Sequence, residues 1–247
     1  MNILTALQND KIKYRHEYKF LADEKDIVLV KAALGSLLSK DVHAGENGAY
    51  VIRSVYFDDY NNSCYEQNED GTDQRGKYRI RIYDGSDESI RLEHKIKKRG
   101  MTYKESVPLT RKQCDRLIRG QILPVDAKAM AGYPELLKQL LVLMMTRRML
   151  PKVIVEYERI PYVCKEGNVR ITLDMNIVSS DRVEDLFDSN LIKRPIMPKG
   201  RHILEVKYDE FLPSYIKKNL ELGKLRQSTF SKYYLCRTYE MKGVHYV

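Results

Sequence analysis

The chain has 247 residues, of which 43% are hydrophobic and 31% are charged, so a folded protein is expected and a disordered one is excluded. Its 43 Lys and Arg against 34 Asp and Glu give a formal charge of +9, which indicates an anionic partner: nucleic acid, an acidic membrane surface or a phosphate compound. The longest apolar run, Leu140 to Met145, is too short to cross a bilayer, so no membrane span is predicted.

The cysteines and the start of the chain bear on the cellular compartment. The four cysteines lie far apart and form no CxxC pair, so a zinc site is not expected: Cys64, Cys114, Cys164 and Cys236. Met1 to Asp10 lacks the basic start and apolar run of a signal peptide. We therefore predict free thiols and a cytoplasmic protein. No repeat or linker divides residues 1–247, which predicts a single domain.

The first half of the chain predicts strands interrupted by one helix. Tyr14 to Phe20 alternates in side-chain type as a half-buried strand does, and Asp23 is typical of a helix N-cap. The apolar face of that helix is predicted to carry Ile27, Val28, Val30, Leu34 and Leu37. Further strands are predicted at Tyr50 to Phe57, Lys77 to Tyr83, Ile90 to Ile96 and Thr102 to Leu109. Asp84-Gly85 and Arg99-Gly100 predict the turns between the last three.

In the second half of the chain the sequence predicts helices first and further strands after them. Thr110 is a candidate N-cap for a short helix with Leu117 and Ile118 on its apolar side, and Pro134 opens a helix to about Leu150. Strands are predicted at Lys152 to Tyr162, Val169 to Met175 and His202 to Tyr208. Two helices follow, from Pro213 to Leu222 and around Ser231 to Glu240. Hairpin-like spacing with inserted helices favours an antiparallel α+β fold.

The charged residues of these strands occupy alternate positions. Arg79 and Arg81 share one face opposite Ile80 and Ile82, and several other strands repeat the pattern of Arg or Lys with Glu. For any single strand, an open sheet with its charged side in water explains this as well. The repetition, and the use of Arg with its rigid fork of donors, favours a sheet rolled into a tunnel that binds phosphate oxygens. The run from Lys97 to Arg99 is interpreted as solvated surface that could guide a polyanion to the entrance.

Six segments carry a resemblance to a known family. They are Arg15-His16-Glu17-Tyr18-Lys19-Phe20, Ser54-Val55-Tyr56-Phe57-Asp58, Tyr78-Arg79-Ile80-Arg81, Glu93-His94-Lys95, Glu205-Val206-Lys207-Tyr208 and Phe230-Ser231-Lys232-Tyr233. In this order they resemble the VTC (vacuolar transporter chaperone) domain, the polyphosphate polymerase module of the CYTH-like, or triphosphate tunnel metalloenzyme, superfamily. The resemblance runs from about Tyr14 to Tyr234 and implies a tunnel of about eight antiparallel strands with helices packed outside.

The resemblance also implies an activity and a set of site residues. It implies transfer of the ATP γ-phosphoryl group to a growing inorganic polyphosphate chain, with Mn²⁺ or Mg²⁺ as cofactor. Carried over position by position, it implies catalytic roles for Lys19, Arg79, Arg81, Lys95, Arg159 and Lys232. It further implies phosphate contacts from Lys104, Tyr157, Arg170, Lys207 and Ser231, and metal binding by Glu205.

Two departures from the family pattern stand out. The superfamily opens with ExExK, whereas Arg15 stands here in place of the first Glu; this fits the polymerase branch and leaves Glu17 and Glu93 as candidate further ligands. The sequence also shows no counterpart of the phosphate-sensing domain and transmembrane helices of the fungal complex. We therefore expect a cytoplasmic protein, at most at the inner face of the membrane, with a separate membrane partner if the product is exported.

Two other functions stay open. A tunnel triphosphatase would hydrolyse triphosphate or a nucleotide γ-phosphate, although the missing first Glu makes a water-activating site harder to assemble. A non-catalytic module would bind polyphosphate or nucleic acid. Nucleic acid is not the expected partner, because single-strand binders add aromatic platforms along an open groove, whereas the 18 tyrosines mostly lie opposite or beside the charged face.

Overall fold

One antiparallel sheet organises the computed structural model, which describes residues 14–41, 48–220 and 224–242. Its strand order is β11-β1-β10-β8-β7-β3-β4-β5-β6. Within the described ranges the long strands are β1 (His16–Asp23), β3 (Tyr50–Asp58), β4 (Arg75–Tyr83), β5 (Ser86–Lys98), β6 (Met101–Pro108), β7 (Leu150–Cys164), β8 (Val169–Ser180) and β10 (Arg201–Tyr208). The remaining three have two residues each: β2 (Ser39–Lys40), β9 (Arg194–Pro195) and β11 (Arg226–Gln227). The prediction of an α+β fold built on about eight antiparallel strands is confirmed.

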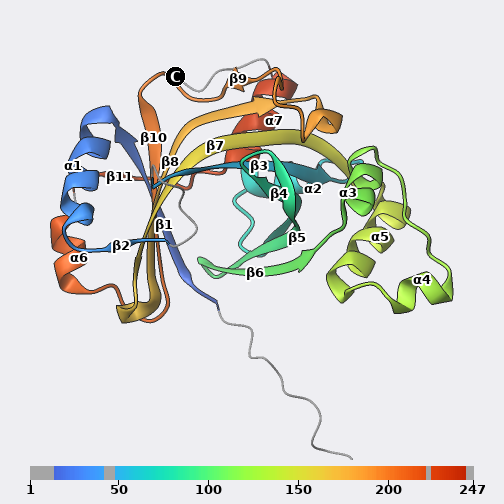
Figure 1. Ribbon diagram of the computed structural model, residues 1–247, viewed down its shortest axis with the longest axis horizontal. Helices are drawn as coiled ribbons and strands as arrows, with labels where there is room; N and C mark the ends of the chain where they lie inside the picture. Colours follow the sequence, from blue (N-terminus) through green and yellow to red (C-terminus); the bar gives the residue numbers. More distant parts are fainter. Residues whose placement is uncertain (1–13, 42–47, 221–223, 243–247) are drawn as a thin grey trace, which may run out of the picture.

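The sheet curls far enough for β1 and β6 to meet. Arg15, next to β1, and Thr102 of β6 exchange two backbone hydrogen bonds, each with an N···O distance of 2.9 Å. Figure 1 shows the strands wrapping around a central space, with β1 and β6 approaching each other below it. This bridge turns the curved sheet into a tunnel.

Both predicted hairpin turns are present. Asp84 and Gly85 have φ angles of 50° and 72°, and Arg99 and Gly100 have φ angles of 51° and 75°. Two successive positive φ angles match the right-handed twist of the flanking strands, which explains the glycine at the second turn position. The turns join β4 to β5, whose register shifts between Arg81 and Tyr83, and β5 to β6.

Short helices connect and cover the strands. They are α1 (Glu24–Gly35), α2 (Ser63–Glu69), α3 (Arg111–Ile118), α4 (Ala127–Ala131), α5 (Glu135–Arg147), α6 (Ser214–Asn219) and α7 (Lys232–Lys242), with 3₁₀ turns at Glu166–Asn168 and Val183–Asp185. Asp23 caps α1 and Thr110 caps α3, and both form capping boxes with the third helical residue. Both predicted N-caps are therefore confirmed.

The structure corrects several predicted boundaries and faces. The helix predicted to reach Leu150 ends at Arg147, because Arg148 turns the chain with a left-handed φ of 51° and Leu150 already belongs to β7. Val28 and Leu37 are predicted on the apolar face of the first helix, but Val28 is 65% exposed and Leu37, which lies beyond the end of α1 at Gly35, is 40% exposed. The helices α2 and α4 were not predicted, since seven and five residues are too few to display a helical period. The predicted helix over residues 213–222 is observed as α6 up to Asn219, and its last two positions lie outside the described residues.

Three apolar clusters hold helices to the two faces of the sheet. One joins α3 and α5 to the outer face of β3, β4 and β5, and a second joins α1 and α6 to the outer face of β1, β8 and β10. These helices lie on opposite flanks of the tunnel in Figure 1. The third cluster packs α2 and α7 against inward-facing residues of β3 and β7. The rest of the inner face is left to charged side chains.

Two predictions about cysteines and membranes can be compared with these elements. All four cysteines are free, and three of them are buried. None of the helices in the described ranges has the length and apolar composition that crossing a bilayer requires.

We predict that the cluster under α5 contributes strongly to stability. Leu137 is fully buried, so Leu137→Ala should lower the free energy of unfolding by about 2 to 5 kcal/mol through lost transfer energy and a residual cavity. Val142 lies on the same helix with 44% exposure, and Val142→Ala should change it by less than about 0.5 kcal/mol. Urea unfolding of both variants measures the difference, and equal losses would contradict this packing.

Candidate functional site

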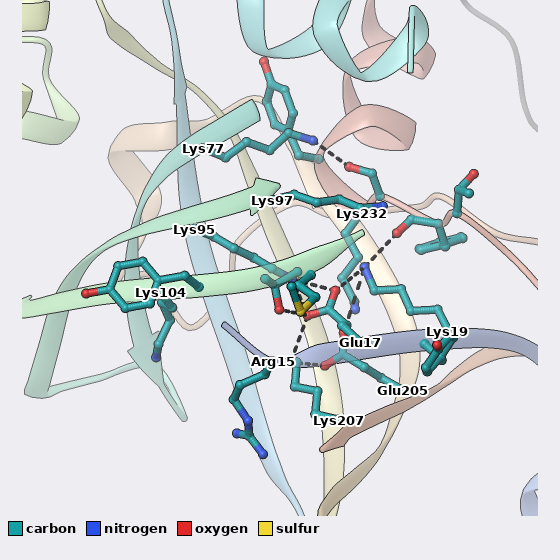
Figure 2. Close-up of a pocket in the computed structure, with 18 of the residues that line it drawn as sticks. Arg15, Glu17, Lys19, Lys77, Lys95, Lys97, Lys104, Glu205, Lys207 and Lys232 are labelled. Carbon is teal, nitrogen blue, oxygen red and sulfur yellow. Dashed lines mark hydrogen bonds and ion pairs between the residues drawn. The ribbon is translucent and has the colours of Figure 1, made fainter. Parts of the chain in front are cut away.

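The tunnel encloses a cavity of about 1050 Å³ lined mainly by cationic and tyrosine side chains. Figure 2 shows lysines from several strands converging on it. The structure places all twelve predicted site residues in its wall: Lys19, Arg79, Arg81, Lys95, Lys104, Tyr157, Arg159, Arg170, Glu205, Lys207, Ser231 and Lys232. Their convergence is an observation, while the role of each stays a prediction.

Strand register explains how residues far apart in sequence become neighbours. On β4, alternate residues point inward, so Lys77, Arg79 and Arg81 face the cavity. Across the sheet, Lys77 lies opposite Lys95 of β5, which lies opposite Lys104 of β6. Three ammonium groups thus form one row on three strands. Like charges placed this way repel, so the fold must compensate them.

Glu93 compensates one part of this charge. Its carboxylate oxygens lie 2.7 Å from Nη2 of Arg79, 2.6 Å from Nζ of Lys104 and 3.6 Å from Nη1 of Arg81. Burial raises the pKa of the Glu93 carboxyl, but the attraction of Arg81, Arg79 and Lys104 outweighs it and holds the pKa well below its ordinary value. Glu93 is therefore a permanent anion that orients three cations.

Glu17 and Glu205 form a second anionic centre where β1 and β10 pair. Lys95 donates to both oxygens of Glu17, at 2.7 and 2.6 Å, and Lys207 donates to Glu205. Lys19 lies between them, 3.3 Å from Glu17 and 3.9 Å from Glu205. Burial opposes ionisation of both carboxyls, but the surrounding lysines lower both pKa values well below the ordinary range. Figure 2 draws this group below Lys95.

Asp174 forms the third centre. Arg159 donates to its two oxygens at 2.7 and 2.8 Å, and Lys232 at the start of α7 donates to the same carboxylate. The Tyr157 ring lies 4.5 Å from the Lys232 ammonium, which adds a cation–π contact. Asp174 is fully buried, so its charge fixes Arg159 and Lys232 in place. The structure thus places Asp174 as an ion-pair partner of an arginine.

The remaining predicted residues, Arg170 and Ser231, make other contacts in the cavity wall. Arg170 contacts Asp41 at 2.7 Å and donates to the Tyr50 hydroxyl at 3.1 Å. Ser231 accepts a hydrogen bond from the backbone of Tyr234 in the first turn of α7. Arg15, which stands in place of the family's first Glu, lies 2.7 Å from Asp209. The substitution therefore brings a cation rather than a carboxylate to the cavity wall.

Besides Arg15, four cations in the wall are not among the predicted site residues. They are Arg75, Lys77, Lys97 and Arg99. The interpretation of Lys97 as solvated surface is wrong, because Lys97 is half-buried in the cavity wall; Lys98 is exposed, and Arg99 lines the cavity but is exposed as well. Lys97 lies two residues after Lys95, and this spacing carries the signal that could have identified it. β5 continues its alternation to Lys98, beyond the end of the predicted strand, and Arg99 lies in the turn that follows.

The donor set allows a divalent cation only in partnership with a ligand. Among the described residues no group of three or more His, Cys, Asp and Glu is arranged to hold a metal. Glu17 and Glu205 nevertheless bring two carboxylates within electrostatic reach of each other. Mg²⁺ is commonly bound by one or two carboxylates together with water and substrate phosphates. The residues fit such an ion, provided that it displaces part of their contact with lysine.

Taken together, the wall presents more guanidinium and ammonium groups than carboxylates, and the carboxylates fix most of those cations from behind. Arg79, Arg81 and Arg159 each keep further N–H donors beyond those used in the wall. Preorganised donors of this kind suit a multiply charged oxyanion and need little rearrangement when it binds.

Comparisons with known structures agree with the fold. A candidate adenylate cyclase from Bacillus halodurans superimposes with a TM-score of 0.53 at 14% identity, covering 89% of this chain and 94% of that one. A candidate adenylyl cyclase from Hippeastrum, described as having a dominant triphosphatase activity, gives a TM-score of 0.52 at 12% identity, covering 92% and 95%. At such identities the likeness shows the fold alone. A search of curated proteins found no match.

The family is shown by sequence. The model of the VTC domain matches residues 14–239, a range that includes every predicted site residue. The residues that line the cavity and the strands that close it lie inside the match, which also includes most of α7. The chain therefore belongs to the VTC domain family.

Proposed function

We propose that this chain is a polyphosphate polymerase that transfers the γ-phosphoryl group of ATP to the end of an inorganic polyphosphate chain inside the tunnel. Membership of the VTC domain family and a phosphoryl-handling tunnel fold support the general chemistry. The cationic wall supports a substrate made of linked phosphates. Phosphoryl transfer needs positioning and charge neutralisation more than covalent help from the protein, and this wall supplies both.

In the proposed step, a terminal oxygen of the polyphosphate chain attacks the γ-phosphorus of ATP. A new P–O bond forms, the bond from that phosphorus to the β–γ bridging oxygen breaks, and ADP leaves with the electron pair. Arg79, Arg81 and Arg159 would neutralise charge on the phosphate oxygens. Lys19 and Lys232 would orient the two phosphate groups. Glu205, with Glu17 beside it, would hold a divalent cation, which would supply positive charge to the reacting phosphate groups.

The observation that carries the choice of polymerase is the state of the carboxylates. Glu17 and Glu205, which line the cavity, and Glu93 and Asp174, which contact cations of its wall, all accept bonds from Lys or Arg and have lowered pKa values. Such carboxylates are weak bases. Attack by water requires removal of a proton, whereas an ionised phosphate oxygen needs none. The wall therefore favours a phosphate nucleophile over water.

The decisive experiment follows the product. Purified protein incubated with ATP and Mn²⁺ or Mg²⁺ should give a ladder of phosphate chains on a polyacrylamide gel, together with ADP. The ladder should disappear when the metal is chelated. Release of free phosphate without a ladder would identify a triphosphatase instead. Binding of polyphosphate with no turnover at all would identify a non-catalytic module.

A second prediction concerns the metal role of Glu205. Glu205→Gln keeps the shape of the side chain and removes its charge, so metal-dependent turnover should fall at least about tenfold and require more metal. Glu210→Gln removes the same charge from an exposed position close to the end of β10 and should leave turnover unchanged. Turnover measured over a range of Mn²⁺ concentrations provides the readout. Wild-type metal dependence in the Glu205 variant would end its assignment as a ligand.

A further inference from the structure

Three half-buried cations at one end of the cavity differ from the other cations of the wall that are not exposed. Arg75, Lys77 and Lys97 line the cavity where β4 and β5 meet α2, and each is half-buried. Arg75 lies directly opposite Lys97 in the register of the two strands. In the described part of the chain, no carboxylate lies within ion-pair distance of any of the three. Opposed like charges without a counterion destabilise a sheet.

Lys77 is held by neutral groups. Its ammonium donates to the Asn68 amide oxygen of α2 at 3.0 Å and to the Ser231 hydroxyl before α7 at 2.9 Å. It also lies 5.2 Å from the centre of the Tyr233 ring. Burial is the main cause that lowers its pKa to about 7, with Cys64 and Asp58 opposing this and Arg75 and Lys19 adding to it. The ammonium is thus oriented but electrically uncompensated.

Its two neighbours share this condition. Arg75 donates to the backbone oxygen of Thr72 at 2.7 Å, and burial lowers its pKa although Asp73 acts in the opposite direction through space. Burial also lowers the pKa of Lys97, and the charge of Arg75 adds to that effect. The next lysines in the wall are different, because Lys95 and Lys104 are each paired with a glutamate.

From this contrast we infer that Arg75, Lys77 and Lys97 form an additional anion subsite. It binds phosphate groups of a polyphosphate chain that extend beyond the groups held by the arginines that pair with carboxylates. The inference rests on the proposed function for the identity of the ligand. Along β4, the distance from Arg75 to Arg79 is roughly 13 Å of strand, so a ligand must be extended to reach both ends. A bound triphosphate would leave the subsite empty, whereas a longer chain would fill it. The subsite therefore makes affinity depend on chain length.

The test compares two ligands and two matched charge removals. Inorganic triphosphate and long-chain inorganic polyphosphate are titrated into wild-type protein, Lys77→Met and Lys98→Met by calorimetry. Lys77→Met should bind the long chain about tenfold more weakly, the loss expected for one charged hydrogen bond, and bind triphosphate within about twofold of wild type. Lys98 is the exposed neighbour on β5, and its replacement should alter neither affinity. Lys77→Arg should restore most of the preference for long chains.

Several outcomes would overturn the subsite. Unchanged long-chain affinity in Lys77→Met, or equal losses for both ligands, would contradict it while leaving the proposed function intact. An equal loss in Lys98→Met would reduce the effect to general surface charge and would contradict it as well. Wild-type protein that binds neither ligand would contradict the proposed function and, with it, the subsite. If thermal melting shows that Lys77→Met does not fold, Lys97→Met gives the same comparison from the opposite strand.

Discussion

The ion pairs between buried carboxylates and the cations of the inner wall are the interaction on which the tunnel depends. A curved sheet with this many guanidinium and ammonium groups on its concave face would repel itself. Glu93, Glu17, Glu205 and Asp174 prevent this by standing behind or between the cations. The cost of burying these charges is offset only because several partners surround each carboxylate. The same contacts fix the direction in which the remaining donors point, so stability and binding geometry have one cause.

The fold and most of the wall could be predicted because alternation along a strand survives in the sequence. Arg79 and Arg81 separated by Ile80 predict both a strand and its two faces, and the register then brings them together with Glu93. The turns at Gly85 and Gly100 were equally readable, since positive φ angles demand particular residues. The resemblance to the VTC domain, rather than periodicity, supplied Lys232 and Ser231, which precede or begin a helix.

What could not be predicted depends on contacts between distant segments. The short helix α2 has no apolar period of its own, and it is anchored by the buried Asp58, whose carboxylate accepts the backbone N–H groups of Cys64 and Tyr65 and the Tyr233 hydroxyl. The spacing of Val28 and Leu37 fits an apolar helix face, but it does not say which side of the helix contacts the sheet. Only the position of the sheet decides which residues are buried. The pairing of Asp174 with both Arg159 and Lys232 likewise needs the sheet and α7 together.

The contacts that close the tunnel also affect how its diameter can vary. Besides the backbone bridge of Arg15 with Thr102, the seam is spanned by side chains: Lys95 of β5 and Thr102 of β6 both reach the Glu17 carboxylate on β1. A group that attracts the Glu17 carboxylate therefore competes with the side-chain contacts that hold β1 to β5 and β6. The diameter of the tunnel is therefore linked to the charge of the ligand inside it. The ligand-bound and the ligand-free tunnel can differ in width.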